Sequence, residues 1–339
     1  MPRDDLSTER DVSAASTVGH AEFTGRPPIG PVTDTDSAAV SQSVINRRWN
    51  PRELTLTVLF LAPAVVGLGA FVVFPLFQAV YLATMGSDIL GNPTRFVGLQ
   101  HFQELLTPEF GAVLARTAGF TLMVVVAGVL LPLALAVPLS QRLPGMRVFR
   151  TLFTLPFAYS ASAASVVWLL MLNPAMSPVN WLLQLVGVRA PGWTTDSGWA
   201  LVTVAGVTVW MVSGFNLLVL AAGLAGLDEQ VLEAARIDGA AGVRHFTGIV
   251  LPMISPSLFF VIVTTTLTAL QSLGQPQVMT DGGPNGATST LVYSIFNQAF
   301  HNNNSNYGLA SAQGLVLLVV GVLLAAVQFG VIERRVHYR

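Results

Sequence analysis

Long apolar runs alternate with short polar stretches along most of the chain, and this pattern predicts the fold. A helix needs about 20 residues to cross a hydrocarbon layer roughly 30 Å thick. Six segments reach that length without a charged residue: about Leu54–Met85, Thr117–Leu139, Thr151–Leu172, Trp199–Leu224, Leu251–Leu273 and Leu309–Ile332. Because helices satisfy every backbone polar group internally in lipid, the pattern predicts an all-α membrane protein with six transmembrane helices.

Several prolines fall inside or beside these segments, including Pro63, Pro132, Pro156 and Pro256. Proline is tolerated in transmembrane helices because neighbouring helices and waters can bind the carbonyls that it leaves free. The prolines therefore do not argue against any of the six spans. Among the polar connections, FVGLQHFQELL (residues 96–106) is expected to form an amphipathic helix on the membrane surface.

The composition indicates that lipid surrounds most of the chain. The sequence is 52% hydrophobic, with a mean hydropathy of +0.62. Only 10% of its residues are charged, whereas a soluble domain carries about 25%. Residues 1–50 are polar and lack the early apolar core of a secretory signal, so we expect a disordered tail there.

The arginines predict the orientation of the chain, because positive residues concentrate on the cytoplasmic side of a membrane. Eleven arginines flank the six segments on one side. This places the tail at 1–50, the connection at 226–252 and the C-terminus at 333–339 in the cytoplasm. The opposite side has three arginines: Arg95, Arg116 and Arg189.

Residue types that are absent from the chain exclude several functions. All 17 basic residues are arginine, so a nucleotide-binding P-loop lysine is missing and any ATPase must be another polypeptide. There is no cysteine, and the five histidines lie outside the six segments, so we expect neither a metal site nor a catalytic centre. The net charge of −1 gives no indication of nucleic-acid binding.

The cytoplasmic connection at 226–252 contains an unusual charged stretch, EAARIDGAAGVRHFTGIVLP, between two apolar segments. Asp228 and Glu229 suit the positive end of a helix dipole, and Gly239 suits a C-terminal helix cap. A second short helix is expected at about residues 241–247. The residues alone leave two interpretations open: a surface helix that merely connects two spans, or a docking element for a cytoplasmic partner.

This string resembles the EAA signature of ATP-binding-cassette (ABC) importer permeases, with its spacing kept throughout. The flanking sequences WMVSGFNLLVLAAGL and MTDGGPNGATSTLVYSIFNQAF are similar to the carbohydrate branch related to the maltose permease. The resemblance covers about Leu54 to the C-terminus and implies a type I (MetI-like) permease fold. A first helix and outer connection would occupy residues 51–110, and a core of five helices residues 111–332.

The resemblance also implies that the loop is a coupling helix seated on a separate ATPase. Glu233 would pair across that contact, two alanines would allow close approach, and Gly239 would set the bend. The alternative for Glu233 is a solvated carboxylate paired with Arg236, a pair worth about 0.2–0.5 kcal/mol. The residues implied in coupling are Glu233, Ala234, Ala235, Asp238, Gly239, Ile249, Leu251 and Pro252.

A set of partners follows from the same resemblance. They are a second homologous permease, two ATPase subunits that hold ATP and Mg²⁺, an extracytoplasmic solute-binding protein, and a sugar or related polyol. The chain itself is expected to bind no cofactor and no nucleic acid. It is expected to be a multi-pass protein surrounded by the lipid of a bacterial plasma membrane.

Neutral polar residues within the fourth and fifth segments are candidates for substrate binding, because polar groups in lipid are costly. No charged residue lies mid-span, so the lining suits a neutral sugar or polyol. Ala269 stands where the maltose pattern has asparagine, which argues against maltose itself. All the candidates except Asn216 and Gln271 are implied by the resemblance; the full set is Thr208, Phe215, Asn216, Thr265, Thr268, Gln271 and Ser272.

Other interpretations of these features stay open at this point. The threonines could instead bond to carbonyls of their own helix or join neighbouring helices. An ion-coupled secondary transporter is the alternative function, although such proteins usually carry an ionisable group within a span. An intramembrane enzyme is disfavoured because HExxH and GxSxG motifs are absent, and a purely structural subunit would not need a polar lining.

Overall fold

The computed structural model describes residues 51–88, 92–139, 145–173, 177–301 and 305–332. The predicted tail at 1–50 and the C-terminus at 333–339 lie outside the described residues. The chain divides into two compact units, residues 1–67 and 68–339. Among the described residues, the first unit holds most of α2 (Pro51–Leu68), and the second unit holds all later elements.

Six spans are present when a bent pair of helices is counted as one span. Within the described residues, four helices are long and apolar enough to cross a membrane: Thr55–Ala83, Pro108–Leu139, Ser197–Ala225 and Tyr307–Gly330. Two pairs pass the same test together but are bent, by 107° and 73° respectively: Val148–Ala158 with Ala161–Met171, and Gly242–Met253 with Ser255–Leu270. The predicted six spans are confirmed, but the third and fifth are not single straight helices.

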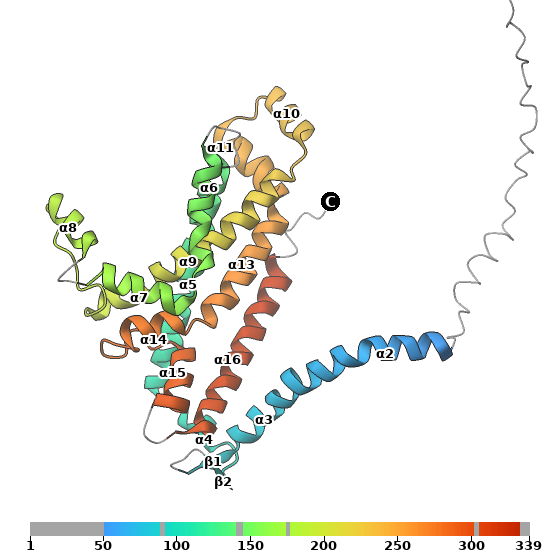
Figure 1. The fold of residues 1–339 in the computed structure, drawn as a ribbon, viewed down its shortest axis with the longest axis vertical. Helices are drawn as coiled ribbons and strands as arrows, with labels where there is room; N and C mark the ends of the chain where they lie inside the picture. Colours follow the sequence, from blue (N-terminus) through green and yellow to red (C-terminus); the bar gives the residue numbers. More distant parts are fainter. Residues whose placement is uncertain (1–50, 89–91, 140–144, 174–176, 302–304, 333–339) are drawn as a thin grey trace, which may run out of the picture. The chain divides into compact units, whose positions relative to one another are not determined.

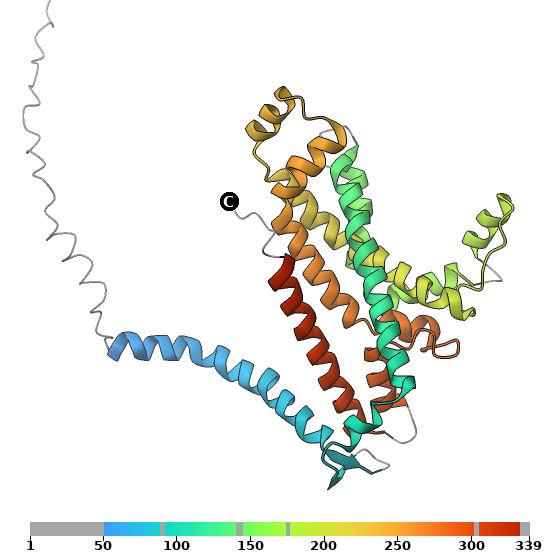
Figure 2. The ribbon, with the colours of Figure 1, turned by 180° about the vertical axis from the view of Figure 1, so that it is seen from behind.

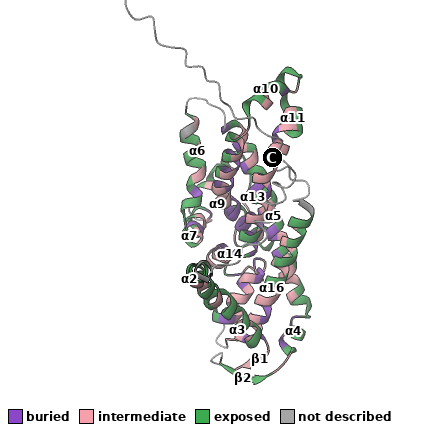
Figure 3. Cartoon of the chain, turned by 90° about the vertical axis from the view of Figure 1, so that its right-hand side faces the viewer, coloured by how far each residue is buried: buried purple, intermediate pink, exposed green. Residues whose placement is uncertain are grey.

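Four helices form the body of the second unit: α5 (Pro108–Leu139), α9 (Ser197–Ala225), α13 (Ser255–Leu270) and α16 (Tyr307–Val327). α9 packs along α5, and α13 packs against both (Figures 1 and 2). In the most apolar part of α9, 61% of the residues are buried, whereas in the most apolar part of the last span, Tyr307–Gly330, 17% are (Figure 3). α9 is therefore the central helix of the bundle. The fully buried side chains of this core include Phe120, Val124, Val204, Leu217, Leu220 and Val261.

The third span is broken into α6 (Met146–Thr154), the 3₁₀ turn η2 (Leu155–Ala158) and α7 (Ala161–Met171). Pro156 lies in the turn, and Tyr159 and Ser160 then take extended backbone angles, with ψ of 146° and 149°. The Ser160 hydroxyl caps α7 by accepting a backbone N–H at 3.2 Å. Gly214 of α9 allows this turn to pack closely, because a Cβ there would lie 2.9 Å from the Thr154 carbonyl oxygen.

The fifth span is also in pieces: α11 (Gly242–His245), the π-helical η3 (Phe246–Val250), α12 (Leu251–Met253) and α13. The break falls at Ile254, just before Pro256. Because Pro256 cannot donate to the carbonyl four residues earlier, that oxygen on Pro252 is bound instead by the Ser255 hydroxyl at 2.7 Å. The third and fifth spans are therefore interrupted beside Pro156 and Pro256.

The second unit has two distinct ends. The EAA end carries α10 (Glu229–Ile237) and α11, and the hairpin end carries a two-stranded antiparallel sheet of β1 (Met85–Ser87) and β2 (Pro93–Phe96). The remaining described elements are η1 (Gly69–Val73), α3 (Phe74–Ala83), α4 (Gln100–Glu104), α8 (Pro178–Leu185), α14 (Gly274–Thr280), α15 (Leu291–Phe296), η4 (Asn297–His301) and η5 (Gln328–Ile332).

Two details at the hairpin end differ from the expectations. The segment 96–106 does not form a long amphipathic surface helix, since it holds the end of β2 and then only the five residues of α4. Arg116 lies inside α5 rather than in a connection, because α5 begins at Pro108. Its guanidinium lies beside Gly286 at this same end of the unit. Arg116 therefore still counts among the three arginines on the side opposite the EAA loop.

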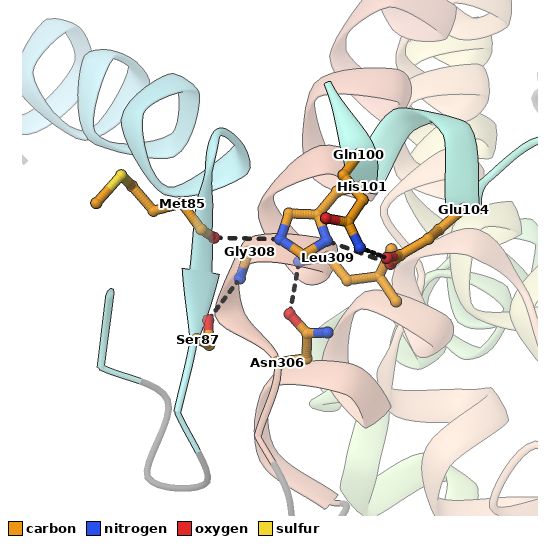
Figure 4. Close-up of polar contacts among 8 residues, drawn as sticks. All are labelled: Met85, Ser87, Gln100, His101, Glu104, Asn306, Gly308 and Leu309. Carbon is orange, nitrogen blue, oxygen red and sulfur yellow. Dashed lines mark hydrogen bonds and ion pairs between the residues drawn. The ribbon is translucent and has the colours of Figure 1, made fainter. Parts of the chain in front are cut away.

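A buried histidine joins three elements at the hairpin end (Figure 4). The His101 side chain belongs to α4; its Nε2 lies 3.1 Å from the Met85 carbonyl oxygen and its Nδ1 3.3 Å from a Glu104 carboxylate oxygen. Both partners are oxygens that can accept a hydrogen bond, so the ring links the start of β1 to its own helix. Gly308, at the start of α16, passes directly against the ring, and there is no room for a side chain at that position.

We predict that Gly308→Ala destabilises the protein while Gly314→Ala does not. A Cβ at Gly308 would overlap the His101 ring and the Met85 carbonyl, and such overpacking costs about 1–3 kcal/mol. Gly314 lies on the same helix with nothing within 4 Å of the added carbon. Apparent melting temperatures in detergent, followed by size-exclusion chromatography, should fall only for Gly308→Ala. Equal melting temperatures for the two variants would contradict this packing.

Candidate functional site

A cavity of about 530 Å³ lies among α9, α13, α14 and the bend of the third span. Its lining within the described residues has no charged side chain. Every candidate substrate residue predicted from the sequence lines it: Thr208, Phe215, Asn216, Thr265, Thr268, Gln271 and Ser272. The sequence prediction therefore located one contiguous surface, although a binding role for these residues remains a prediction.

Aromatic side chains form one wall of this cavity, and two of them were missed from the sequence. Phe157 and Tyr159 come from the bend of the third span. The Phe157 ring lies 5.3 Å from the ring of Phe215, and Tyr159 stacks on Trp210 with 6.5 Å between ring centroids. The available signal was the string LPFAYS, in which Pro156 and a capping serine mark a break that turns both rings toward α9.

Five of the seven candidates are already hydrogen-bonded within the protein, and three of them, Thr208, Asn216 and Thr265, are at most 2% exposed. Asn216 is 1% exposed, and its Nδ2 donates to the Gly128 carbonyl oxygen at 2.7 Å and to Thr265 Oγ1 at 2.9 Å. Thr208 donates to the Val204 carbonyl of its own helix at 2.9 Å. Asn216 and Thr265 therefore join helices, as the alternative interpretation proposed, in addition to lining the cavity.

The other polar groups keep more capacity for a ligand. The Gln271 side chain is exposed and has no hydrogen-bond partner within the described part of the chain. Thr268 donates to the Thr264 carbonyl, which leaves its oxygen able to accept. Ser272 donates to Gln275 Oε1 at 2.7 Å, so these two form a short polar pair at the cavity edge. An aromatic ring beside an unpaired amide and hydroxyl oxygens that can still accept is able to bind a polyol.

The EAA loop forms a short capped helix, α10, as its residues predict. Asp228 Oδ1 accepts a hydrogen bond from the Gln230 N–H at 2.9 Å and caps the N-terminus. Gly239 has a φ of +81°, and its N–H bonds to the Arg236 carbonyl at 3.1 Å. The next N–H bonds to the Ala235 carbonyl at 3.0 Å, which completes a Schellman cap and confirms the predicted role of Gly239 as the cap.

The two alanines of the EAA string have different surroundings. Ala235 is only 9% exposed, whereas Glu233, Ala234 and Asp238 are exposed. Glu233 makes no ion pair with Arg236 among the residues that the structure describes. Only Ala234 is therefore placed to allow close approach from outside, and Glu233 is available to a partner.

Apolar side chains at the tip of the loop were missed from the sequence. Ile237 is 86% exposed and Val243 is 78% exposed, on the two short helices that flank Gly239. Ile249, Leu251 and Pro252, by contrast, are half-buried at the foot of the loop. These two side chains add an exposed apolar surface to a tip whose other exposed residues include Glu233 and Asp238.

The connection after α14 is held against α5 at the hairpin end. Tyr293 donates its hydroxyl to Asp281 Oδ1 at 2.9 Å. Burial, followed by this bond to a carboxylate, raises the pKa of Tyr293 to about 12, so the phenol remains a donor across the physiological range. Thr117 Oγ1 on α5 accepts the Leu291 N–H at 2.8 Å. The connection is therefore fixed to the second span.

Comparison with known proteins places the cavity and the EAA loop in one family of proteins. The family described as "Binding-protein-dependent transport system inner membrane component" matches residues 128–338, which contain the cavity residues on α9, α13 and α14 and the whole EAA loop. The chain belongs to this family. It is an inner membrane component of an ABC importer, with the permease fold that the EAA string implied.

Relatives of this permease are described as sn-glycerol-3-phosphate transport system permease proteins, UgpA. The one from Agrobacterium fabrum is 35% identical over 84% of this chain and 96% of its own length. The one from Pectobacterium atrosepticum is 32% identical over 88% of this chain and 99% of its own length. The likeness therefore extends over nearly the full length of these relatives.

A solved structure shares the fold of this permease. It is the crystal structure of a bacterial alginate ABC transporter in complex with an alginate pentasaccharide-bound periplasmic protein. One of its chains superimposes with a TM-score of 0.72, at 19% identity, over 84% of this chain and 96% of that one. This likeness concerns the fold alone.

Membership in the permease family decides between the alternatives that the sequence left open. An importer permease is a non-catalytic transport subunit that works with a separate ATPase and a solute-binding protein. The ion-coupled secondary transporter is therefore excluded, and so is the intramembrane enzyme. The lack of lysine agrees with this result, because the chain cannot form a P-loop of its own.

We predict that Asn216→Ala lowers the stability of this permease, whereas Gln271→Ala leaves it unchanged. Removing Asn216 deletes two interhelical hydrogen bonds, each worth about 0.6 to 1.7 kcal/mol in a membrane protein. Gln271 lines the same cavity, but its side chain bonds to no other described residue. The apparent melting temperature in detergent tests this difference. A melting temperature of Asn216→Ala equal to wild type would show that Asn216 does not hold the helices together.

Proposed function

We propose that this permease imports a sugar or related polyol, and that its cavity holds uncharged hydroxyl-bearing parts of the substrate. The observation that carries the proposal is a lining with aromatic rings and a free amide but no charge. Aromatic faces stack on sugar rings, and neutral polar groups hydrogen-bond to hydroxyls. The relatives named for glycerol 3-phosphate support a polyol substrate.

The proposal assigns any anionic group of the substrate to another subunit. An unpaired anion inside a low-dielectric site is strongly disfavoured. Within the described residues, the cavity offers it no arginine or histidine. A phosphate or carboxylate would therefore be met by the second permease that we expect to complete the transport path.

The EAA loop is proposed as the contact with the ATPase. Its exposed tip, with Glu233, Ala234, Ile237 and Val243, fits a cleft that accepts a small apolar knob. We expect two ATPase subunits holding ATP and Mg²⁺, one for each permease of a pair, together with an extracytoplasmic solute-binding protein. Both termini and the EAA end would then face the cytoplasm of a bacterial cell.

The work of the chain is conformational. The loop continues through α12 into α13, and α13 carries Thr265 and Thr268 in the cavity wall. ATP binding to the ATPase would shift the balance between inward-open and outward-open states, which have different affinities for the substrate. Coupling therefore requires that a force on α10 reaches α13.

We predict that Gln271→Ala weakens uptake of the transported polyol without destabilising the protein. The loss of one neutral hydrogen bond, about 1 kcal/mol, corresponds to roughly a fivefold rise in the half-saturating concentration. Uptake by proteoliposomes that contain the full importer measures this effect. Gln103→Ala, an exposed glutamine at the hairpin end, is the matched control and should transport like wild type. Unchanged uptake by Gln271→Ala would count against this cavity.

We also predict that Ile237→Asp releases the ATPase. The side chain is 86% exposed, so its replacement should not disturb the fold, but a buried aspartate would be unpaired in the contact. The tagged permease is expressed with its genomic neighbours, purified in mild detergent, and its partners are identified. Wild type and Gln230→Ala, another exposed position on α10, should retain the ATPase, while Ile237→Asp should keep only the second permease. Retention of the ATPase by Ile237→Asp would move the contact elsewhere.

A further inference from the structure

Three phenylalanine rings from three different elements pack in a row beside the cavity. The ring centroids of Phe157, in the bend of the third span, and Phe215, on α9, are 5.3 Å apart. Those of Phe215 and Phe260, on α13, are 6.3 Å apart. Both distances fall within the range of packed aromatic pairs, about 4.5–7 Å. These three side chains, called the phenylalanine row below, therefore form a continuous apolar strip across the bend, α9 and α13.

The phenylalanine row lies on the side of the cavity that faces the EAA end. α9 runs toward the EAA loop, and Phe215 and Asn216 are the last cavity-lining residues along it. α13 runs away from the EAA loop, and Thr264 is the first of its residues to line the cavity. Phe260 precedes Thr264 by about one helical turn, so it lies beyond the cavity toward the EAA end. A path from the cavity to the EAA end along α9 and α13 therefore passes the row.

Two of the rings are fixed to α9, and the third is not. Phe215 belongs to α9 itself. Phe157 is held against α9 at Gly214, where an added Cβ would lie 3.1 Å from both the backbone nitrogen and the Cβ of Phe157. Phe260 belongs instead to α13, which continues from the EAA loop through α12 (Figure 1). A displacement of α13 along α9 would therefore separate Phe260 from Phe215 and leave the other pair of rings in contact.

We propose that the phenylalanine row is the inner gate of the transport path and that Phe260 is its moving part. This inference rests on the proposed function, because it takes the cavity as the substrate site. While the rings are in contact, the apolar row blocks water and hydroxyl-bearing solutes between the cavity and the EAA end. When the EAA loop displaces α13, Phe260 leaves the row and the barrier opens.

The competing interpretation is that the rings only hold the helices together. A ring with that role is expected to be buried like Phe120, which is 0% exposed. Phe157 and Phe260 are instead 58% and 48% exposed, so most of one ring and half of the other remain free to border a path. Packing alone predicts that removing a ring lowers stability without changing which side of the membrane can reach the cavity. Access to the cavity therefore distinguishes the two interpretations.

This access can be measured at one introduced cysteine, because the chain has none of its own. Thr268→Cys places a thiol in the cavity wall. The full importer is reconstituted in proteoliposomes, and a membrane-impermeant thiol reagent is added on the ATPase side, with and without a non-hydrolysable ATP analogue. Labelling is read on this chain alone from its shift in mass. We expect labelling in one of the two nucleotide states and protection in the other.

In the same Thr268→Cys background, Phe260→Ala should lose most of this protection and be labelled in both states. Phe260→Trp keeps a large ring and should keep the protection. Phe300→Ala is the matched control, because its ring also packs against two others, Phe296 and Tyr307, with centroid distances of 5.5 and 6.1 Å, but near the start of α16. It should be labelled like the background chain.

Three results would overturn the inner gate. Protection that persists in Phe260→Ala would show that the ring only packs the helices. Equal loss of protection in Phe300→Ala would show a general loosening of the protein. No labelling of Thr268→Cys in either state, from either side of the membrane, would show that the cavity is not on the transport path, and only this result would overturn the proposed function as well.

A cross-linking experiment tests the moving part without truncating a ring. Two double-cysteine variants, Phe215→Cys with Phe260→Cys and Phe157→Cys with Phe215→Cys, are treated with a short, cleavable thiol cross-linker in the full importer. Uptake by each is compared with uptake by the same variant before treatment and after cleavage. The first cross-link joins α13 to α9 and should stop uptake reversibly, whereas the second joins two fixed residues and should not. Continued uptake with the first cross-link in place would show that Phe260 does not move away from Phe215.

Discussion

The bundle depends on one buried amide. Asn216 of α9 uses both hydrogens of its Nδ2, one toward the Gly128 carbonyl of α5 and one toward Thr265 of α13. The three helices therefore meet at one depth and in one register. Gly128 allows this approach, because a Cβ there would lie 3.0 Å from a methyl of Val212. In lipid, apolar contact alone discriminates weakly between helix pairings, so a shared hydrogen bond has an outsized effect on which pairing forms.

The same constraint, that lipid offers no hydrogen bonds, explains how two spans can bend. A broken helix leaves backbone groups without partners, and each must be satisfied inside the protein. Ser160 accepts an N–H where α7 restarts, and Ser255 donates to the carbonyl that Pro256 leaves free. The first break turns Phe157 and Tyr159 toward α9, opposite the polar face of α13. The cavity exists because the third span is not straight.

Much of this could be predicted from the sequence, for identifiable reasons. Apolar length identified the spans, and the glycine at position 239 identified the end of α10, because both depend on local properties of the chain. The cavity residues on α9 and α13 could be found because neutral polar groups stand out in an apolar span. Phe157 and Tyr159 could not, since an aromatic residue in a span resembles any other lipid-facing residue until the bend is known. The packing of His101 against Gly308 was also hidden, because it joins residues about 200 positions apart.

The fifth span gives a physical route between the proposed ATPase contact and the cavity. Its break at Ile254 lies in a tight place, since Ile254 is 2% exposed and a Cβ on Gly223 of α9 would lie 2.9 Å from Ser257 Cβ. A segment packed this closely cannot absorb a displacement of α12 by local rearrangement. Under the proposed coupling, a force applied at α10 would therefore move α13 along α9. The bond between Asn216 and Thr265 joins α13 to α9 and borders the cavity, so in the proposed mechanism the contact that selects the helix register would also have to follow the change in cavity shape.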